Sequence, residues 1–337
     1  MTTMLRADQV ARARQLLDTV RRGCNEVLLG QQELVDLCVI ALCARGHLLL
    51  EGLPGLGKTE LVKALGRLLG LSFRRVQFTP DLLPGDITGG PVLQEQGGQR
   101  AFVFRQGPLF ANVVLADEIN RSSPKTQSAL LEAMQERAVT VLGETHPLPR
   151  PFFVLATQNP IELEGTYPLP EAQLDRFLFK VTVPGVDAEV MTRILTTRRR
   201  GEPPPPTAVL SAAELDELFT LVDAVFLPQA VAGYIARLVA STHPTATAPA
   251  AVREAVRYGA SPRAAIAMGE AARAAALLAG RPNVDFDDVR RVAAPALAHR
   301  LVLQHAARIG GSTAATIVDR VLEAVPMVAT ALPGSVL

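Results

Sequence analysis

The sequence is 337 residues long, enough for two domains that each bury a core of their own. Its 34 basic and 33 acidic residues nearly cancel, and a net charge of +1 argues against a protein that binds nucleic acid mainly through phosphates. Its three cysteines are too few for a disulfide framework and their spacing suits no zinc site, so we expect buried, inert thiols in a reducing compartment.

The sequence does not have the pattern of a membrane protein. The N-terminal stretch MTTMLRADQVARARQ has no apolar core after a basic start, as a signal peptide would have. The longest apolar run, LVDLCVIALCARGHLLL at 34–50, is interrupted by Asp36 and Arg45 and is short for a bilayer crossing. We expect a buried helix leading into a buried strand, in a cytoplasmic protein without a transmembrane segment.

A glycine-rich turn follows the first strand-like run, HLLLEG. The spacing Gly52-x-x-x-x-Gly57-Lys58-Thr59 fits a phosphate-binding loop, whose backbone N–H groups surround the phosphates of a nucleotide. Lys58 would reach the β- and γ-phosphates, and the Thr59 hydroxyl would hold Mg²⁺. An ordinary strand-turn-helix connection is the alternative. The amphipathic pattern KTELVKALGRLLG favours the phosphate loop, because the positive end of that helix would face the anion.

Short apolar runs alternate with helical patterns as far as residue 184. The runs span 47–52, 73–78, 112–117, 152–157 and 179–183. This alternation predicts an α/β fold with a parallel sheet covered on both faces. The segment between the second and third runs, 79–112, is too long for a simple loop, and we expect an insertion with its own hairpin or helix.

Two adjacent carboxylates end the third run, NVVLADE. Hydrolysis of a nucleotide needs a carboxylate that orders the metal and a group that orients water. Asp117 would hold the Mg²⁺ shell and Glu118 would polarise the water, because neighbouring side chains at a strand end can point in different directions. A solvated acidic strand end is the alternative, and the phosphate loop upstream argues against it.

Three further polar residues are candidates with alternatives. Asn159, at the end of PFFVLATQN, would hydrogen-bond the γ-phosphate or the water, or else cap a loop. Arg176 lies just before the fifth run, where it could simply form an ion pair with Asp175 or Glu171 on the surface. Arg263 lies in the first turn of a predicted helix, where the helix dipole disfavours a cation and a distant anion would neutralise it.

The composition changes after residue 184. The sequence becomes alanine-rich and helical, with a break at RRRGEPPPPT where four prolines favour an extended spacer. We therefore expect an α/β core at 1–185, a connecting helix and Pro-rich linker at 186–206, and a smaller all-α domain at 207–337.

Four stretches resemble one protein family closely. GLPGLGKT, LADEINRSSPKTQSALLEAMQE, ATQNP and EAQLDRF together resemble the MoxR family of AAA+ ATPases, and the resemblance extends over about residues 8–330. It implies an ATP hydrolase with a five-stranded parallel P-loop core, an all-α lid domain, and ATP and Mg²⁺ as cofactors.

The resemblance implies roles for single residues. Asp117 and Glu118 become the Walker B pair, and Asn159 becomes sensor 1. Arg176 becomes an arginine finger that serves the ATP of the neighbouring subunit, and Arg263 becomes sensor 2 in the lid.

Two segments would hold the nucleotide by the same resemblance. VLLGQQELV is similar to the family's adenine-side segment, which implies that Gly30 and Gln31 lie near the base. Arg121 follows Walker B closely and either reaches a neighbouring subunit or forms a local salt bridge. The Walker A loop would contribute Leu53, Pro54, Gly55, Leu56, Gly57, Lys58, Thr59 and Glu60.

Two further segments resemble features of the helix-2-insert clade. Residues from about 81 to 107 resemble the insert itself, and residues from about 137 to 151 resemble the hairpin before sensor 1. Both features are shared with magnesium chelatase motor subunits and would project toward the centre of a ring. The implied assembly is a closed ring, which we expect to be a hexamer, with ATP at each interface.

The activity implied by the resemblance is chaperone-like remodelling or maturation of a client protein, with a partner that has a von Willebrand factor A domain. The segment TPDLLPGDITGGPV carries no aromatic residue to grip a polypeptide, so we expect action on a docked partner rather than processive unfolding. A magnesium-chelatase-like motor is the main alternative. A nucleic-acid-remodelling ATPase is a weaker one, because the chain has no Trp and no basic stripe interleaved with aromatic residues. A small-molecule kinase is disfavoured because Glu118 favours water as the acceptor.

Overall fold

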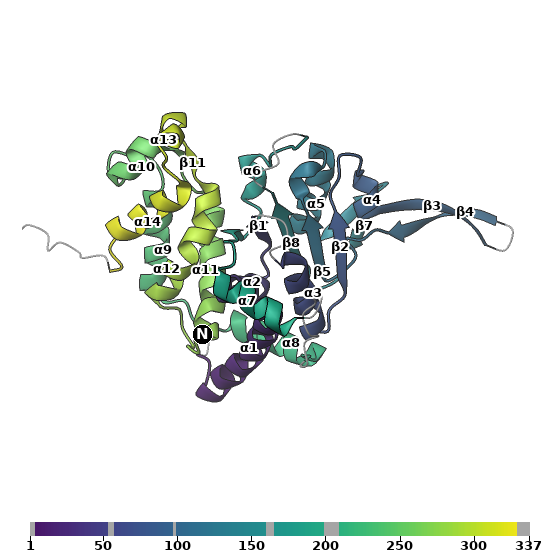
Figure 1. Ribbon diagram of the computed structural model, residues 1–337, viewed down its shortest axis with the longest axis horizontal. Helices are drawn as coiled ribbons and strands as arrows, with labels where there is room; N and C mark the ends of the chain where they lie inside the picture. Colours follow the sequence, from purple (N-terminus) through teal and green to yellow (C-terminus); the bar gives the residue numbers. More distant parts are fainter. Residues whose placement is uncertain (1–3, 53–56, 97–98, 160–164, 199–208, 329–337) are drawn as a thin grey trace, which may run out of the picture. The chain divides into compact units, whose positions relative to one another are not determined.

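Two compact units make up the chain. The computed structural model describes residues 4–52, 57–96, 99–159, 165–198 and 209–328 (Figure 1). The core unit comprises residues 16–216, and the helical unit comprises residues 1–15 and 217–337.

These boundaries differ from those expected from composition, which assigned the N-terminal residues to the α/β core. Helix α1 (Ala7–Val27) begins in the helical unit. There Arg12 Nε lies 3.4 Å from Glu217 Oε2, and a Cβ at Gly280 would lie 3.1 Å from Arg14 Cδ. These contacts join residues more than 200 positions apart, which composition along the chain does not reveal.

A five-stranded parallel sheet forms the centre of the core unit. Its strand order is β2-β5-β8-β1-β9, and each strand is parallel to its neighbours. The five apolar runs of the sequence form these strands, so the predicted parallel sheet is confirmed. Because β8 lies between β5 and β1, the carboxyl ends of these three strands meet at one edge of the sheet. The strands are β1 (Leu48–Glu51), β2 (Phe73–Gln77), β5 (Val113–Asp117), β8 (Phe153–Gln158) and β9 (Phe179–Thr182).

Both faces of this sheet are buried. Consecutive residues of a strand point to opposite faces, and Leu48, Leu49 and Leu50 of β1 all have exposed fractions of 0%. One cluster joins the sheet to the inner face of α5 through Leu130, Leu131 and Met134. Such two-sided cover is typical of parallel sheets, because their crossover helices pack on both faces. The helices of this unit that bury residues include α2 (Gln32–Cys43), α3 (Lys58–Leu68) and α5 (Pro124–Glu136).

Two hairpins extend the core unit. The insertion after β2 contains α4 (Pro84–Thr88), β3 (Gly89–Gln96) and β4 (Gln99–Gln106), and the last two form a long ribbon (Figure 1). The second hairpin is β6 (Ala138–Val141) with β7 (Glu144–Pro147). Glycine is required at the base of the first, because a Cβ on Gly89 would lie 2.2 Å from Arg105 O.

The first hairpin exposes an aromatic side chain. The segment TPDLLPGDITGGPV has none, but Leu93 of β3 pairs with Phe102 of β4, which is 73% exposed. Phe104 lies closer to the base and stacks on His146 of β7, with ring centroids 3.9 Å apart. Residues 79–92 therefore do not represent the whole hairpin. Strand β4 pairs with β3 and adds Phe102, an aromatic side chain that could contact a polypeptide.

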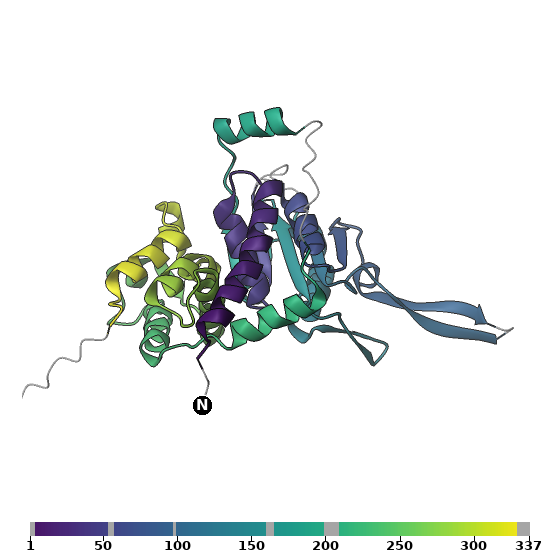
Figure 2. The ribbon, with the colours of Figure 1, turned by 90° about the horizontal axis from the view of Figure 1, so that it is seen from below.

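Short helices follow β8 in the core unit. Helix α6 (Glu171–Leu174) precedes β9, and α7 (Ala188–Thr197) follows it. Helix α7 has no buried residue and stands clear of the sheet in Figure 2.

The helical unit fits the expected lid, with one addition. Val256 pairs with Leu303 in a short antiparallel ladder between β10 (Val256–Tyr258) and β11 (Val302–Leu303). Composition did not predict this ladder, because Val256 and Leu303 are 47 positions apart in an alanine-rich, helical region. The helices are α8 (Ala212–Asp223, which starts in the core unit), α9 (Gln229–Ser241), α10 (Ala250–Ala255), α11 (Pro262–Leu278), α12 (Phe286–Leu297), α13 (His305–Ile309) and α14 (Ala314–Ala324).

The cysteines agree with the expected inert thiols. Cys24, Cys38 and Cys43 are buried and unbridged. Burial raises the pKa of Cys24 and of Cys43 to about 12, which disfavours the reactive thiolate.

Among the described residues, none of the helices is both long enough and apolar enough to span a bilayer.

Candidate functional site

A cavity of about 540 Å³ lies in the core unit at the carboxyl edge of the sheet. Its volume is in the range of small-molecule sites. The wall is apolar in one part, at Val27, Leu28, Leu29, Val186, Met191 and Ile194. Its polar part includes Lys58, Thr59, Glu60, Arg75, Gln77, Asp117, Glu118, Thr157 and Asn159.

The predicted phosphate loop leads into the polar part. Gly57 has a φ of 78° and caps α3, which begins at Lys58. Lys58 Nζ donates to Gly52 O at 2.7 Å. Burial lowers the pKa of the Lys58 ammonium, although the charges of Asp117 and Glu118 oppose this shift. A helix N-terminus with a nearby ammonium is a ready site for an anion. The other predicted loop residues, Leu53, Pro54, Gly55 and Leu56, lie outside the described residues.

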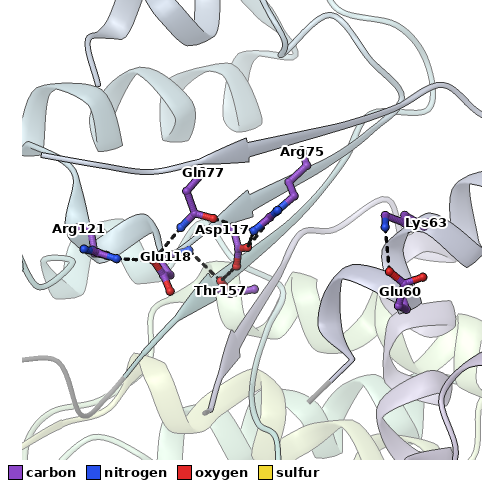
Figure 3. Close-up of polar contacts among 8 residues, drawn as sticks. All are labelled: Glu60, Lys63, Arg75, Gln77, Asp117, Glu118, Arg121 and Thr157. Atoms are coloured by element: carbon purple, nitrogen blue, oxygen red, sulfur yellow. Dashed lines mark hydrogen bonds and ion pairs between the residues drawn. The ribbon is translucent and has the colours of Figure 1, made fainter. Parts of the chain in front are cut away.

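The next two predicted residues lie in the first turn of α3. Thr59 and Glu60 both line the cavity. Glu60 Oε1 accepts a hydrogen bond from Lys63 Nζ at 2.8 Å (Figure 3). The hydroxyl-bearing side chain of this turn is Thr59, which lines the same cavity as Asp117.

Asp117 is held through both carboxylate oxygens. Its Oδ1 accepts from the Thr157 hydroxyl at 2.6 Å. Its Oδ2 accepts from Arg75 Nε at 3.1 Å and from Arg75 Nη2 at 2.7 Å (Figure 3). The carboxylate is thus fixed between β8 and β2.

Glu118 has different partners because the chain turns after Asp117. The φ of Glu118 is 57°, in the left-handed region. Its Oε2 accepts from Gln77 Nε2 at 2.7 Å and from Arg121 Nη1 at 2.9 Å (Figure 3). Of the two alternatives for Arg121, the structure has the local salt bridge. The expectation that the two carboxylates diverge agrees with this geometry.

Three residues of this network were not singled out from the sequence. Arg75 and Gln77 share one face of β2, and Gln77 is in register with Asp117. Thr157 Oγ1 accepts from the backbone N–H of Glu118 at 2.8 Å. The alternating pattern of FRRVQ could have placed Arg75 and Gln77 together, but only the strand order shows that β2 and β8 flank β5.

Asn159 and Gln31 also line this cavity. Asn159 is 8% exposed, and its backbone oxygen accepts from Asn120 Nδ2 at 3.3 Å. Gln31 Nε2 donates to Pro184 O at 3.0 Å. Gly30 has a φ of 73°, and a Cβ there would lie 2.5 Å from Val190 Cγ2 of α7.

Neither of the two predicted arginines is among the described residues that line this cavity. Arg176 Nη1 donates to Leu131 O at 2.8 Å. With Glu132 and Gln135, Arg176 lines a second cavity, of about 360 Å³, and none of the described residues lines both cavities. Arg263 is exposed in the first turn of α11, in the helical unit.

Comparison with known proteins gives matches over both units. Residues 47–179 match a family of ATPases associated with various cellular activities, and residues 248–321 match an AAA lid domain. The chain is 43% identical to the chaperone MoxR1 of Mycobacterium tuberculosis over 317 residues, covering 92% of this chain and 82% of that protein. It belongs to the MoxR family of AAA+ ATPases.

A second relative and a solved structure support this assignment. The protein MoxR of Paracoccus denitrificans is 34% identical over 297 residues, covering 84% of this chain and 87% of that protein. A crystal structure of a candidate ATPase from Cytophaga hutchinsonii is 38% identical and covers 95% of this chain and 97% of its own, with a TM-score of 0.84. The family, the P-loop fold with a helical lid and the ATPase activity expected from the sequence are thereby confirmed. This MoxR-family chain binds and hydrolyses ATP.

Proposed function

We propose that the 540 Å³ cavity is the ATP site and that its residues have the Walker and sensor roles implied by the family. Lys58 and the first N–H groups of α3 bind the phosphates. Glu118 orients the attacking water and accepts its proton, and Asn159 hydrogen-bonds the water or the γ-phosphate. The presence of all these residues on the wall of one cavity supports the proposal.

We propose further that Mg²⁺ is held at Thr59 and Asp117. A hydroxyl and a carboxylate are oxygen ligands of the kind that Mg²⁺ takes in proteins, together with phosphate oxygens and water. When bound, Mg²⁺ supplies charge that stabilises the phosphate oxygens. The residues fit this ion, because Thr59 and Asp117 line the same cavity and Thr157 fixes the Asp117 carboxylate by donating to its Oδ1.

The adenine base occupies the apolar part of the cavity in this proposal. Gly30 and Gln31 lie beside that part, between α1 and α2. Gln31 itself lines the cavity, and the absence of a side chain at Gly30 lets α7 approach. Apolar walls with a few polar groups are typical of such sites.

The active unit is a closed ring, with a hexamer as the expected assembly, in which Arg176 reaches the ATP of the neighbouring subunit. The observation that carries this proposal is the separation of Arg176 from the ATP cavity within one chain. An arginine supplied to the γ-phosphoryl group accelerates related hydrolases by roughly 10³ to 10⁵. The helical unit acts as the lid, with Arg263 as its sensor arginine.

The ring proposal is tested by complementation. Glu118→Gln and Arg176→Ala chains with different tags are co-expressed, and assemblies that contain both are purified. Each variant alone is expected to be inactive. In the mixed assembly, about a quarter of the interfaces would pair an intact Glu118 with an intact Arg176, so ATP hydrolysis returns in part. Mixed assemblies as inactive as either variant, or wild-type activity of Arg176→Ala alone, would contradict a shared site.

ATP hydrolysis drives chaperone-like remodelling or maturation of a client protein in this proposal, with a partner that contains a von Willebrand factor A domain. The name of the Mycobacterium relative, chaperone MoxR1, supports this reading. A magnesium-chelatase-like motor is the alternative. The cytoplasm is the proposed location, since ATP is available there and the three buried cysteines are free thiols.

This role is tested with a tagged model protein that is already unfolded. Because the client must be docked through a partner, the purified ATPase is expected not to translocate it, whatever the ATP concentration. Translocation by the ATPase alone, measured as ATP-dependent loss of the fluorescence of a fused reporter, would show that no docked partner is needed.

A further inference from the structure

A cation from the protein itself occupies one side of Asp117. Both Nε and Nη2 of Arg75 donate to Oδ2 of Asp117, at 3.1 and 2.7 Å. The other oxygen, Oδ1, accepts from Thr157 at 2.6 Å. Two donors of one guanidinium on a carboxylate form a charge-assisted contact, stronger than a neutral hydrogen bond. The negative charge of Asp117 is therefore balanced by Arg75.

The strand geometry directs Arg75 to this position. Residues 75 and 77 point to the same face of β2, while Val76 points into the core. Gln77 is opposite Asp117 in the parallel register, and Arg75 reaches along the strand toward it. Arg75 Nη2 also donates to Gln77 Oε1 at 2.8 Å, which orients the guanidinium toward the carboxylate (Figure 3).

The two partners of Asp117 differ in how easily they can leave. The Arg75 side chain is 48% exposed, whereas that of Asp117 is 17% exposed. Thr157 also accepts from the backbone N–H of Glu118, so it is held in the sheet. Arg75 can turn into solvent at low cost, because part-exposed ion pairs contribute little to stability.

We propose that Arg75 is a counter-ion that competes with the divalent cation for Asp117. The inference rests on the proposed metal site at Thr59 and Asp117. A guanidinium at Oδ2 occupies a carboxylate oxygen that the cation or its water shell requires, and its positive charge repels the cation. Arg75 must therefore release Oδ2 before Asp117 can face the metal, and until then it holds the carboxylate in place.

The test measures metal affinity rather than turnover. Mn²⁺, which takes the same oxygen ligands as Mg²⁺, is titrated into the full-length protein saturated with ADP, and free Mn²⁺ is measured by electron paramagnetic resonance. Arg75→Gln is expected to tighten Mn²⁺ binding about two- to five-fold, the range of a part-exposed ion pair. Arg75→Lys, which keeps the charge but loses the two-donor contact, should lie between wild type and Arg75→Gln.

Two comparisons make the result specific. Arg74→Gln removes a charge from the neighbouring exposed position of β2 and should leave Mn²⁺ affinity unchanged. In the Asp117→Asn background, Arg75→Gln should have no further effect, because the group for which it competes is gone. The affinity for ADP in excess EDTA should be the same in wild type and Arg75→Gln.

The outcomes separate this inference from the metal site on which it rests. If Asp117→Asn leaves Mn²⁺ affinity unchanged, the proposed metal site is wrong, and the inference fails with it. If Asp117→Asn weakens binding but Arg75→Gln fails to tighten it, only the competition by Arg75 is wrong. Weaker ADP binding by Arg75→Gln in EDTA would make Arg75 a phosphate ligand, and this would also overturn the inference.

Discussion

At the residue scale, the adjacent carboxylates Asp117 and Glu118 contact different side chains because the backbone turns between them. Asp117 is the last residue of β5, and its side chain meets Arg75 of β2 and Thr157 of β8. Glu118 adopts a left-handed backbone conformation, and its side chain meets Gln77 and Arg121. A positive φ is uncommon for a residue other than glycine, and it is often retained at functional sites.

Glu118→Gln is expected to separate ATP binding from hydrolysis. The amide keeps the size of the side chain but cannot accept a proton from water, so kcat should fall by about 10² or more. The affinity for a fluorescent ADP analogue should change little, because the proposed phosphate ligands are Lys58 and the first N–H groups of α3, which the substitution leaves intact. Steady-state hydrolysis and fluorescence titration measure the two quantities.

Glu95→Gln is the matched control for this change. Glu95 lies on the β3–β4 hairpin, where its side chain forms an exposed ion pair with Arg100 at 3.7 Å. Its kcat should equal that of the wild type. Retention of full kcat by Glu118→Gln would show that another group orients the water.

A buried histidine makes the stability of the core unit depend on pH. His47 Nε2 lies 3.1 Å from Met134 O, and Nδ1 accepts from the backbone N–H of Val154 at 3.1 Å. Both contacts suit a neutral ring with its proton on Nε2. Burial lowers the pKa of His47 from 6.5 to about 4, with a smaller opposing effect of the bond to Met134.

This pKa predicts a loss of stability in acid. Above pH 6.5 the ring is neutral in both states and has no effect, whereas below 6.5 the unfolded chain takes up a proton that the folded chain takes up only near pH 4. At pH 5 the loss is about 2 kcal/mol. Urea unfolding at pH 7.5 and 5.0 measures the free energy of unfolding of wild type and His47→Asn. The decrease between the two pH values should be about 2 kcal/mol smaller in His47→Asn than in wild type. An equal difference in the variant would exclude His47 as the titrating group.

At the scale of elements, two helices in the core unit have similar caps and different surroundings. The Ser123 side chain accepts from the N–H of Thr126 at 3.4 Å at the start of α5, and Asp187 accepts from the N–H of Val190 at 2.7 Å at the start of α7. Helix α5 buries six residues, whereas α7 buries none. Packing therefore supports α5, and α7 depends more on its own cap.

Removing the two caps should have different effects. Asp187→Ala is expected to speed amide hydrogen exchange in α7 about five-fold without lowering the melting temperature, because a cap contributes about 1 kcal/mol and α7 opens by itself. Ser123→Ala should instead destabilise the whole core unit, by about 0.5–1 kcal/mol. Exchange followed by mass spectrometry and thermal unfolding measure the two effects. A lower melting temperature for Asp187→Ala would mean that α7 unfolds together with the core.

At the scale of the whole molecule, the distribution of cationic groups between two cavities bears on assembly. The cavity proposed to bind ATP includes Lys58 and Arg75, while Arg176 lines a second cavity of the core unit. An arginine that acts on the γ-phosphate from a separate cavity would require a second copy of the chain. Symmetric rings form when such a head-to-tail contact closes on itself.

Specific ATPase activity should therefore rise with protein concentration and level off once the ring is complete. Sedimentation velocity of Glu118→Gln with ATP should show a particle of about six chains, because in the proposed ring this variant would keep unhydrolysed ATP at the interfaces. Wild-type protein without nucleotide serves as the comparison. Activity per chain that is constant over the whole concentration range, with a monomer in sedimentation, would indicate a site complete within one chain.

Much of the core unit could be predicted because its signals are local in the sequence. Short strand-like runs that alternate with helical patterns located all five strands without tertiary information, although β2, FRRVQ, is partly exposed and less apolar than β1, β5 and β8. The phosphate loop and the Asp117-Glu118 pair depend on spacing over a few residues. Their convergence on one cavity follows from the rule that strand ends in a parallel sheet share an edge.

The sequence by itself thus determined the family, the sheet and the main polar residues of the site. Only the tertiary structure decided which side chains surround those residues. Arg75 and Thr157 contact Asp117 because β2 and β8 flank β5, and that strand order is set by long-range packing. In the same way, Arg176 donates to Leu131 of α5 because two segments 45 residues apart in the sequence pack together. Local spacing encodes the elements, and the free energy of burying them together selects their neighbours.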